Sequence, residues 1–210
     1  MTSRDAASGG SDPRSERAVA DLLAHAPAGP DQAALRDAFV AHLRAHPDAL
    51  SRSGPPAHLT AGCVVLDARS ERVCLVLHRK ARAWFQPGGH LEAADAGLAA
   101  AAARESREET GLPGLVVDPH PVDLDRHALS GAFGRCTEHL DVRFLAVAPE
   151  GAEPVCSPES LDVRWWPVDD LPTAEPALAR LVAAGLERAT RPTEPASDGV
   201  RAGACGVDVP

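Results

Sequence analysis

The sequence predicts an α/β fold in which strand-forming segments lie on both sides of one central helix and another helix closes the domain. Apolar runs at residues 59–66, 73–77 and 139–147 have the length and composition of strands. Between them, an alanine-rich run at 96–103 continues into a glutamate-rich segment that stops at Gly111, which is typical of a helix with a glycine C-cap. Residues 173–188 repeat leucine and valine at helical spacing.

Two further helices are predicted ahead of this domain, at residues 15–26 and 31–46. Asp31 is the expected N-cap of the second helix, because a carboxylate accepts hydrogen bonds from free N–H groups there. The apolar stripe of that helix consists of Leu35, Phe39, Val40 and Leu43. We interpret the stripe as a face that packs on the main domain; a partner-binding helix is the alternative. Residues 47–57 contain Ser-Gly-Pro-Pro, which indicates a linker.

The remaining segments complete the order of elements. Residues 67–71 are predicted to turn, and 84–86 to form a short strand that leads into Pro87-Gly88-Gly89. Further strands are expected at 115–117, 121–129 and 162–167. The predicted organisation is a disordered segment at 1–12, a helical extension and linker at 13–57, the main domain at 58–189 and a disordered tail at 190–210.

Composition limits the classes of function. The formal charge of −9 and the absence of a basic stripe disfavour a nucleic-acid duplex or an anionic membrane as partner. The five cysteines are scattered, odd in number and never in a CxxC pair, which argues for reduced thiols and against a disulfide framework or a zinc site. Because no signal-peptide core and no run of 18 apolar residues occurs, a cytoplasmic location is expected.

The glutamate-rich helix carries the chemistry. Residues three and four apart lie on one side of a helix, so Glu105, Glu108 and Glu109 gather there and repel one another. A divalent cation removes that repulsion, since Mg²⁺ prefers carboxylate and carbonyl oxygens. A charged, solvated surface helix is the simpler interpretation of these glutamates taken alone.

The wider string around them resembles the Nudix box, the signature of hydrolases that act on nucleoside diphosphates linked to another group. The match begins at Gly89 and continues as Arg-Glu-Ser-Arg-Glu-Glu-Thr-Gly-Leu at 104–112. This sequence departs from the box in three ways: Asp95 replaces a glutamate, the spacer before Arg104 is eight residues instead of seven, and Ser106 replaces an apolar residue. We interpret the first two as a changed entry into the helix, with Glu92 and Asp95 shaping the loop and Asp95 as a possible N-cap.

The resemblance covers residues 58–188 and includes the later string Trp-Trp-Pro-Val-Asp-Asp-Leu-Pro, which is similar to a common ending in this superfamily. It implies a Nudix-type α/β/α sandwich with a mixed sheet, preceded here by the helical extension. The helical lead-in and the alanine-, arginine- and proline-rich style are similar to those of actinobacterial members.

The resemblance also implies roles for residues. Glu105 and Glu109 would bind the metal directly, Glu108 would bind it through water or a second ion, and the Gly88 carbonyl would be a further ligand. The expected cofactor is Mg²⁺, with Mn²⁺ as an alternative. Arg104 would orient the acids through charge-assisted hydrogen bonds, and it is grouped with Glu108 and Glu109 as catalytic.

Other residues are candidates with weaker support. The general base is left open between Glu108, Glu109 and residues that return later in the chain, which are Glu138, His127 and His139. His90, beside the glycines, is a candidate substrate contact together with Gly89, His127 and His139. Lys80 and Arg82 follow a strand and are candidates for holding a phosphate; a solvated basic turn is the alternative.

The leading hypothesis is a divalent-metal-dependent hydrolase that cleaves a diphosphate bond in a small nucleotide substrate. A non-catalytic Nudix module that senses a nucleotide or holds a partner is one alternative. An isopentenyl diphosphate isomerase-like enzyme is disfavoured, because the cysteine of that family's Cys-Gly-His string is absent from Gly88-Gly89-His90. The sequence assigns neither the particular substrate nor the oligomeric state.

Overall fold

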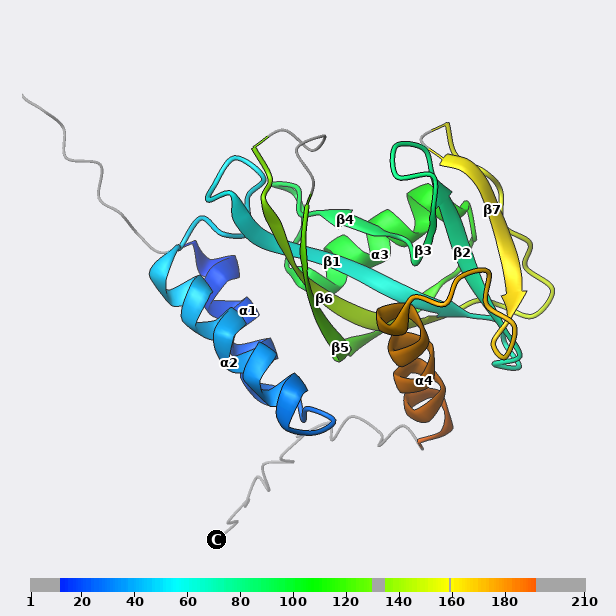
Figure 1. The fold of residues 1–210 in the computed structure, drawn as a ribbon, viewed down its shortest axis with the longest axis horizontal. Helices are drawn as coiled ribbons and strands as arrows, with labels where there is room; N and C mark the ends of the chain where they lie inside the picture. The colour runs from blue at the N-terminus through cyan, green and yellow to red at the C-terminus, as the bar shows by residue number, and fades with distance from the viewer. Residues whose placement is uncertain (1–11, 130–134, 159, 192–210) are drawn as a thin grey trace, which may run out of the picture.

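The structure, a computed structural model, describes residues 12–129, 135–158 and 160–191 (Figure 1). These residues form four helices and seven strands. The helices are α1 (Pro13–Ala24), α2 (Pro30–Ala45), α3 (Leu98–Thr110) and α4 (Pro176–Thr190). The strands are β1 (Ala57–Leu66), β2 (Arg72–His78), β3 (Trp84–Phe85), β4 (Gly88–His90), β5 (Val116–Ala128), β6 (Glu138–Val147) and β7 (Ser160–Pro167).

The strands make one mixed sheet in the order β3-β2-β1-β6-β5, with β4 also paired to β1 and β7 to β2. The β1–β6 pair is parallel, with Ala57 opposite Glu138 and Leu66 opposite Val147. The other strand pairs in this sheet are antiparallel. β1 is buried along almost its whole length because helices cover both faces of the central sheet.

Helices cover the two faces and complete the α/β/α sandwich. On one face, Ala61, Cys63 and Val65 of β1 join a core cluster with α3 and both N-terminal helices. On the other face, Val64 and Leu66 join a second cluster with α4. The resemblance therefore predicted the fold class correctly, including the helices that precede the sheet.

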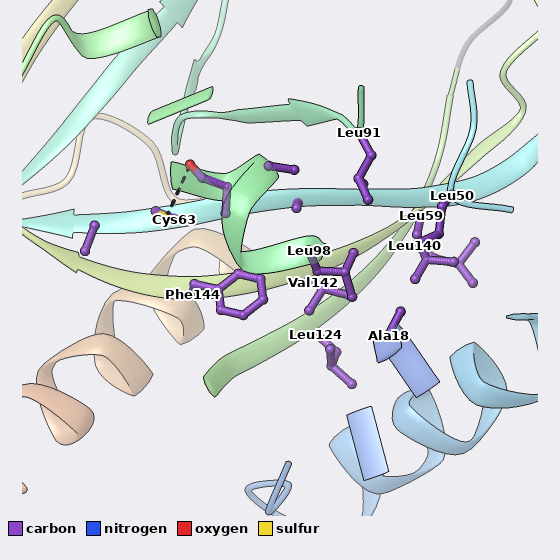
Figure 2. Close-up of a cluster of buried hydrophobic side chains, with 14 of the residues drawn as sticks. Ala18, Leu50, Leu59, Cys63, Leu91, Leu98, Leu124, Leu140, Val142 and Phe144 are labelled. Atoms are coloured by element: carbon purple, nitrogen blue, oxygen red, sulfur yellow. Dashed lines mark hydrogen bonds between the residues drawn. The ribbon is translucent and has the colours of Figure 1, made fainter. Parts of the chain in front are cut away.

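The first core cluster links the N-terminal helices to the sheet. Ala18 of α1 lies in the same apolar cluster as Leu124 of β5 and Phe144 of β6 (Figure 2). Phe39 of α2 is fully buried in it as well. The apolar stripe of α2 is thus part of the core, as we predicted.

Hydrogen bonds add to this attachment. The side-chain amide of Gln32 on α2 accepts from the backbone N–H of Leu124 and donates to the carbonyl of the same residue, at 2.8 Å in both cases. Arg14 of α1 donates to the backbone carbonyl of Glu92 at 2.9 Å, next to the glycine loop. The extension therefore contacts the domain at β5 and beside the Nudix-box segment.

Two of our expectations about helix ends were wrong. The N-cap of α2 is Gly29, and Pro30 occupies the first turn, so Asp31 lies inside the helix instead of capping it. The N-cap of α3 is Gly97, because the carboxylate of Asp95 is bound to other groups. The C-cap was correct: Gly111 has φ +64°, and its N–H donates to the Arg107 carbonyl.

Other boundaries also differ from the predictions. The segment at 47–57 is more than a linker, since Ala49 and Leu50 are buried and Leu59 N–H donates to the Ala49 carbonyl. The strands predicted at 115–117 and 121–129 are parts of one strand, β5 (Val116–Ala128), whose register to β6 shifts near Pro121. β4 was expected only as a loop.

The predicted disordered ends fall mostly on residues 1–11 and 192–210, which lie outside the described part of the chain. Asp12 was assigned to the first of these segments, yet its side chain caps α1 by accepting from Arg14 N–H. Thr190 was assigned to the tail, yet it is the last residue of α4. Within the described residues, no helix has the length and apolarity needed to cross a membrane.

Candidate active site

The glycine loop is held flat against β1 by strand pairing. In β4, Gly88 lies opposite Gly62 and Gly89 opposite Ala61. A Cβ atom on Gly88 would lie 2.6 Å from the Cα of Gly62, and one on Gly89 would lie 2.7 Å from the carboxylate carbon of Glu105. The first contact is with backbone, so position 88 requires glycine, whereas a side chain at position 89 would displace the carboxylate of Glu105.

α3 presents two of its glutamates to this loop. The backbone N–H of Gly88 donates to Oε2 of Glu109 at 3.0 Å, and the carboxylate of Glu105 lies beside Gly89. Glu108 lies further out, with 59% of its side chain exposed against 17% for Glu105. The fold therefore brings Glu105, Glu109 and the glycine backbone together, as the resemblance implied.

Arg104 connects the loop, the helix entry and the acids. Its guanidinium donates to both carboxylate oxygens of Asp95, at 3.1 and 2.9 Å, and to the His90 carbonyl at 2.9 Å. It also donates to Glu105 and Glu108, at 3.0 Å each. Arg104 thus holds three acids and the strand that carries the glycines in one arrangement.

The contact between Arg104 and Asp95 shifts the pKa values of both groups and favours their charged forms. The hydrogen bond to Asp95 raises the pKa of Arg104, with the charge of Glu105 adding to it. Burial alone would raise the pKa of Asp95, but the bonds from Arg104 and from the Glu92 N–H hold it below its ordinary value. Asp95 shapes the loop, as we expected, through its contacts to Arg104 and Glu92.

The predicted substrate residues fall into two groups. His90, His127 and His139 converge on one region: the ring centres of His90 and His139 are 5.0 Å apart, and those of His127 and His139 are 5.4 Å apart. Lys80 and Arg82 lie elsewhere, on the exposed turn between β2 and β3. Only the histidine group is therefore shown to converge next to β4.

Two of these histidines are poor general bases at neutral pH. Burial, together with the nearby His58 and Arg52, lowers the pKa of His90 to about 4. Burial and three neighbouring imidazoles lower the pKa of His139 to about 3. A base is most effective when its pKa lies near the working pH, so His139 is disfavoured as the general base.

Polar residues that the sequence analysis missed line the sheet beside the loop. Asp141 of β6 accepts from Thr60 at 2.9 Å, from Gln86 at 3.2 Å and from Arg143 at 2.8 Å. Arg143 is 4% exposed and also contacts Asp123 at 3.3 Å. The alternation of charges in Val-Asp-Leu-Asp-Arg at 122–126 and Leu-Asp-Val-Arg at 140–143 was the available signal, because it places acids and a base on one face of two strands.

The comparison with known proteins identifies the family. The model of the NUDIX domain matches residues 56–185. The chain belongs to the Nudix family. Members of this family are pyrophosphohydrolases and generally use divalent metal ions.

Solved Nudix structures share the fold. A Nudix hydrolase from Clostridium perfringens is 21% identical, with a TM-score of 0.50, over 62% of this chain and 97% of that chain. An Ap4A hydrolase from C. elegans is 18% identical, with a TM-score of 0.52, over 62% of this chain and 96% of that chain. At these identities the likeness is one of fold alone. A comparison with curated proteins gave no match.

Proposed function

We propose that this Nudix protein is a divalent-metal-dependent hydrolase that cleaves a phosphoanhydride bond in a nucleoside diphosphate derivative. The observation that carries the proposal is the placement of Glu105 and Glu109 against the backbone of Gly88 and Gly89. Mg²⁺ is usually bound by one or two carboxylates together with the phosphates of a substrate. Acidic side chains beside a glycine loop that phosphates can approach suit this arrangement.

The residues present fit a hard divalent cation. Glu105 and Glu109 supply carboxylate oxygens next to the loop, and Glu108 supplies a third from the solvent side. The Gly88 carbonyl is the proposed fourth protein ligand. All of these are oxygen donors, which suit Mg²⁺ or Mn²⁺.

When bound, the metal ion neutralises phosphate charge and lowers the pKa of water. Side chains and backbone of the protein would position the substrate and accept the proton. The missing side chains at Gly88 and Gly89 let a diphosphate approach the backbone, and Arg104 keeps Glu105 and Glu108 oriented through its hydrogen bonds. Glu108 or Glu109 would accept the proton of the attacking water.

Turnover of a mixed substrate panel tests the proposal. The panel contains nucleoside triphosphates, nucleotide sugars and dinucleotides, each assayed with Mg²⁺, with Mn²⁺ and with EDTA. We expect one substrate class to be cleaved only when a metal is present. Nucleotide binding without cleavage of any member would instead favour a sensing module.

Glu109→Gln then tests the site. This change keeps the volume of the side chain but removes an anionic ligand, and metal charge stabilisation amounts to several kcal/mol in the transition state. We expect turnover to fall by roughly 10²–10⁴-fold. Glu150→Gln is the matched control, because it makes the same chemical change at a surface carboxylate that is 77% exposed. Equal activity of the two variants would show that the glutamates are not the metal site.

A further inference from the structure

Three imidazoles and one thiol meet beside the glycine loop, on residues that are far apart in the chain. His58 is near the start of β1, His90 ends β4, His139 lies in β6, and Cys136 stands just before β6. One nitrogen or sulfur atom from each side chain lies within 4.8 Å of the corresponding atom of every other. Strand pairing creates the cluster, since His58 is opposite His139 and His90 is opposite Thr60.

The Nε2 nitrogen of each imidazole in this cluster is buried without a hydrogen-bond partner among the described residues. Among the described residues, no hydrogen bond reaches Nε2 of His58, His90 or His139, and each of these atoms is shielded from solvent. His58 as a whole is 1% exposed. Buried polar atoms in folded proteins are almost always hydrogen-bonded, so three without a partner in one place call for a ligand.

The hydrogen bond at Nδ1 of His58 determines which ring nitrogen carries the proton. Nδ1 of His58 lies 3.0 Å from the carbonyl oxygen of Pro55. A carbonyl can only accept, so Nδ1 carries the proton and Nε2 keeps its lone pair. A backbone carbonyl that fixes the tautomer in this way is the usual outer contact of a histidine that binds a metal.

A backbone hydrogen bond holds the segment of Cys136 next to the residues that precede His58. The next residue, Thr137, donates its N–H to the carbonyl of Pro56 at 2.9 Å, directly beside the proline that holds His58. Cys136 is 7% exposed. His127, although near His139, is held at 3.1 Å by Asp125 and is not part of the set.

We propose that His58, His90, His139 and Cys136 bind one Zn²⁺ ion, in a site separate from the glutamate cluster. Imidazole nitrogens and a thiolate are zinc ligands, whereas the hard cations expected at the glutamates prefer oxygen. Ligands about 2.1–2.3 Å from a tetrahedral zinc lie roughly 3.4–3.7 Å apart, so side-chain shifts of about 1 Å would close the set.

Four protein ligands leave no open position, which is the form of a structural zinc site. The ion would join β1, β4 and β6 at one end of the sheet. His90 follows Gly88 and Gly89 directly, and its carbonyl accepts from Arg104. The zinc would therefore hold the strand that carries the glycine loop.

In the sequence analysis, we took the scattered cysteines and the absence of a CxxC pair as an argument against a zinc site. That argument holds only for ligands that are near neighbours in the chain, such as CxxC pairs. Here the ligands span residues 58–139 and meet only through the sheet register. The structure thus points to a site of a kind that cysteine spacing does not detect.

The first test uses the full chain with any affinity tag removed. The protein is loaded with Zn²⁺, passed through a weak chelator, and its metal content measured by mass spectrometry. We expect about one zinc per chain, retained in Glu109→Gln and in Cys156→Ser, which replaces an exposed cysteine outside the cluster. Cys136→Ser should bind zinc roughly 100-fold more weakly, since even outer contacts cost 10–100-fold.

Cobalt binding supplies a spectroscopic measurement on the unmodified protein. Co²⁺ bound in place of zinc should give the charge-transfer absorption of a cobalt–thiolate bond in the unmodified protein, and this band should disappear in Cys136→Ser. No such band, or zinc lost in Glu109→Gln but retained in Cys136→Ser, would overturn the proposal. A stoichiometric metal other than zinc that depends on Cys136 would overturn the identity of the ion.

Discussion

At the scale of single residues, Gly89 lets helix α3 pack close to the glycine loop. Its missing side chain is what allows the Glu105 carboxylate to lie against β4. Glu105 is in turn held by Arg104 at 3.0 Å, so it has little freedom to move aside. The absence of one methyl group at Gly89 therefore affects where the carboxylate of Glu105, a proposed metal ligand, can lie.

Gly89→Ala tests this directly. The new Cβ would lie 2.7 Å from the carboxylate carbon of Glu105, so the carboxylate must shift and metal affinity should weaken. A misplacement of about 1 Å near the chemistry costs on the order of 100-fold in rate, and we expect a loss of roughly that size. The assay is turnover against Mg²⁺ concentration on the substrate found in the panel.

Gly97→Ala is the matched control, because the nearest atoms to its Cβ belong to the Arg17 side chain at 3.7 and 3.8 Å. This variant should keep its turnover and its metal dependence. If both alanine variants behave alike, close approach of Glu105 to the loop is unimportant for the reaction.

At the scale of elements, α2 behaves as part of the core. Phe39 and Leu43 are buried in the same cluster as the sheet residue Phe144. The favoured interpretation of the apolar stripe was therefore confirmed for these residues, although Leu35 is only partly buried. The helix extends the core beyond the family domain at 56–185.

Phe39→Ala should lower the free energy of unfolding by roughly 3–5 kcal/mol, the usual cost of emptying a buried phenylalanine site. Denaturant unfolding measures this value. Leu23→Ala on α1 is the control: its side chain is 52% exposed, so a change within about 0.5 kcal/mol is expected. Unchanged stability of Phe39→Ala would show that α2 does not depend on this contact.

At the scale of the whole molecule, a charged network joins the α4 layer to the sheet. Arg180 of α4 contacts Asp123 at 2.8 Å and Asp125 at 3.0 Å, and Arg143 of β6 contacts the same two acids from the sheet. Burial would raise the pKa of Asp125, but the hydrogen bond from His127 and the charge of Arg143 hold it well below its usual value. The carboxylate form of Asp125 is thus favoured by folding.

Because the folded pKa of Asp125 is depressed, its contribution to stability is present above its unfolded pKa of about 3.9 and is lost progressively as the pH falls from there toward the folded pKa. Asp125→Asn should cost roughly 1–3 kcal/mol at pH 7, and its deficit relative to the original protein should shrink below about pH 4. Thermal melts from pH 7 down to about pH 2 measure the difference in stability between Asp125→Asn and the original protein. The control Asp37→Asn changes a carboxylate whose side chain is 67% exposed, and this variant should show almost no loss of stability at any pH. A deficit that is constant with pH would contradict this assignment.

The sequence was sufficient for features that are encoded locally. Apolar run length identified β1, β2 and β6, and Gly111 identified the end of α3. The Nudix box placed Glu105 and Glu109 near Gly88 because one motif contains both halves of that contact. The fold class followed from the order of these elements together with the resemblance.

Features that depend on register could not be predicted in the same way. The Asp141 network needs the pairing of β1 with β6, and the histidine cluster needs three strands aligned to within one residue. The burial of Ala49 and Leu50 depends on how a proline-rich segment folds back on β1. Composition indicated a linker there because proline and serine do not reveal tertiary contacts.

The hydrogen bonds from Gln32 to both backbone groups of Leu124 have a consequence for the solubility of the chain. β5 lies at one end of the sheet order, where an unpaired strand offers its N–H and carbonyl groups to other chains. The Gln32 amide occupies that position with one donor and one acceptor, as a neighbouring strand would. A single side chain of the N-terminal extension thus blocks strand addition at the middle of this edge, and so protects the protein against edge-to-edge aggregation.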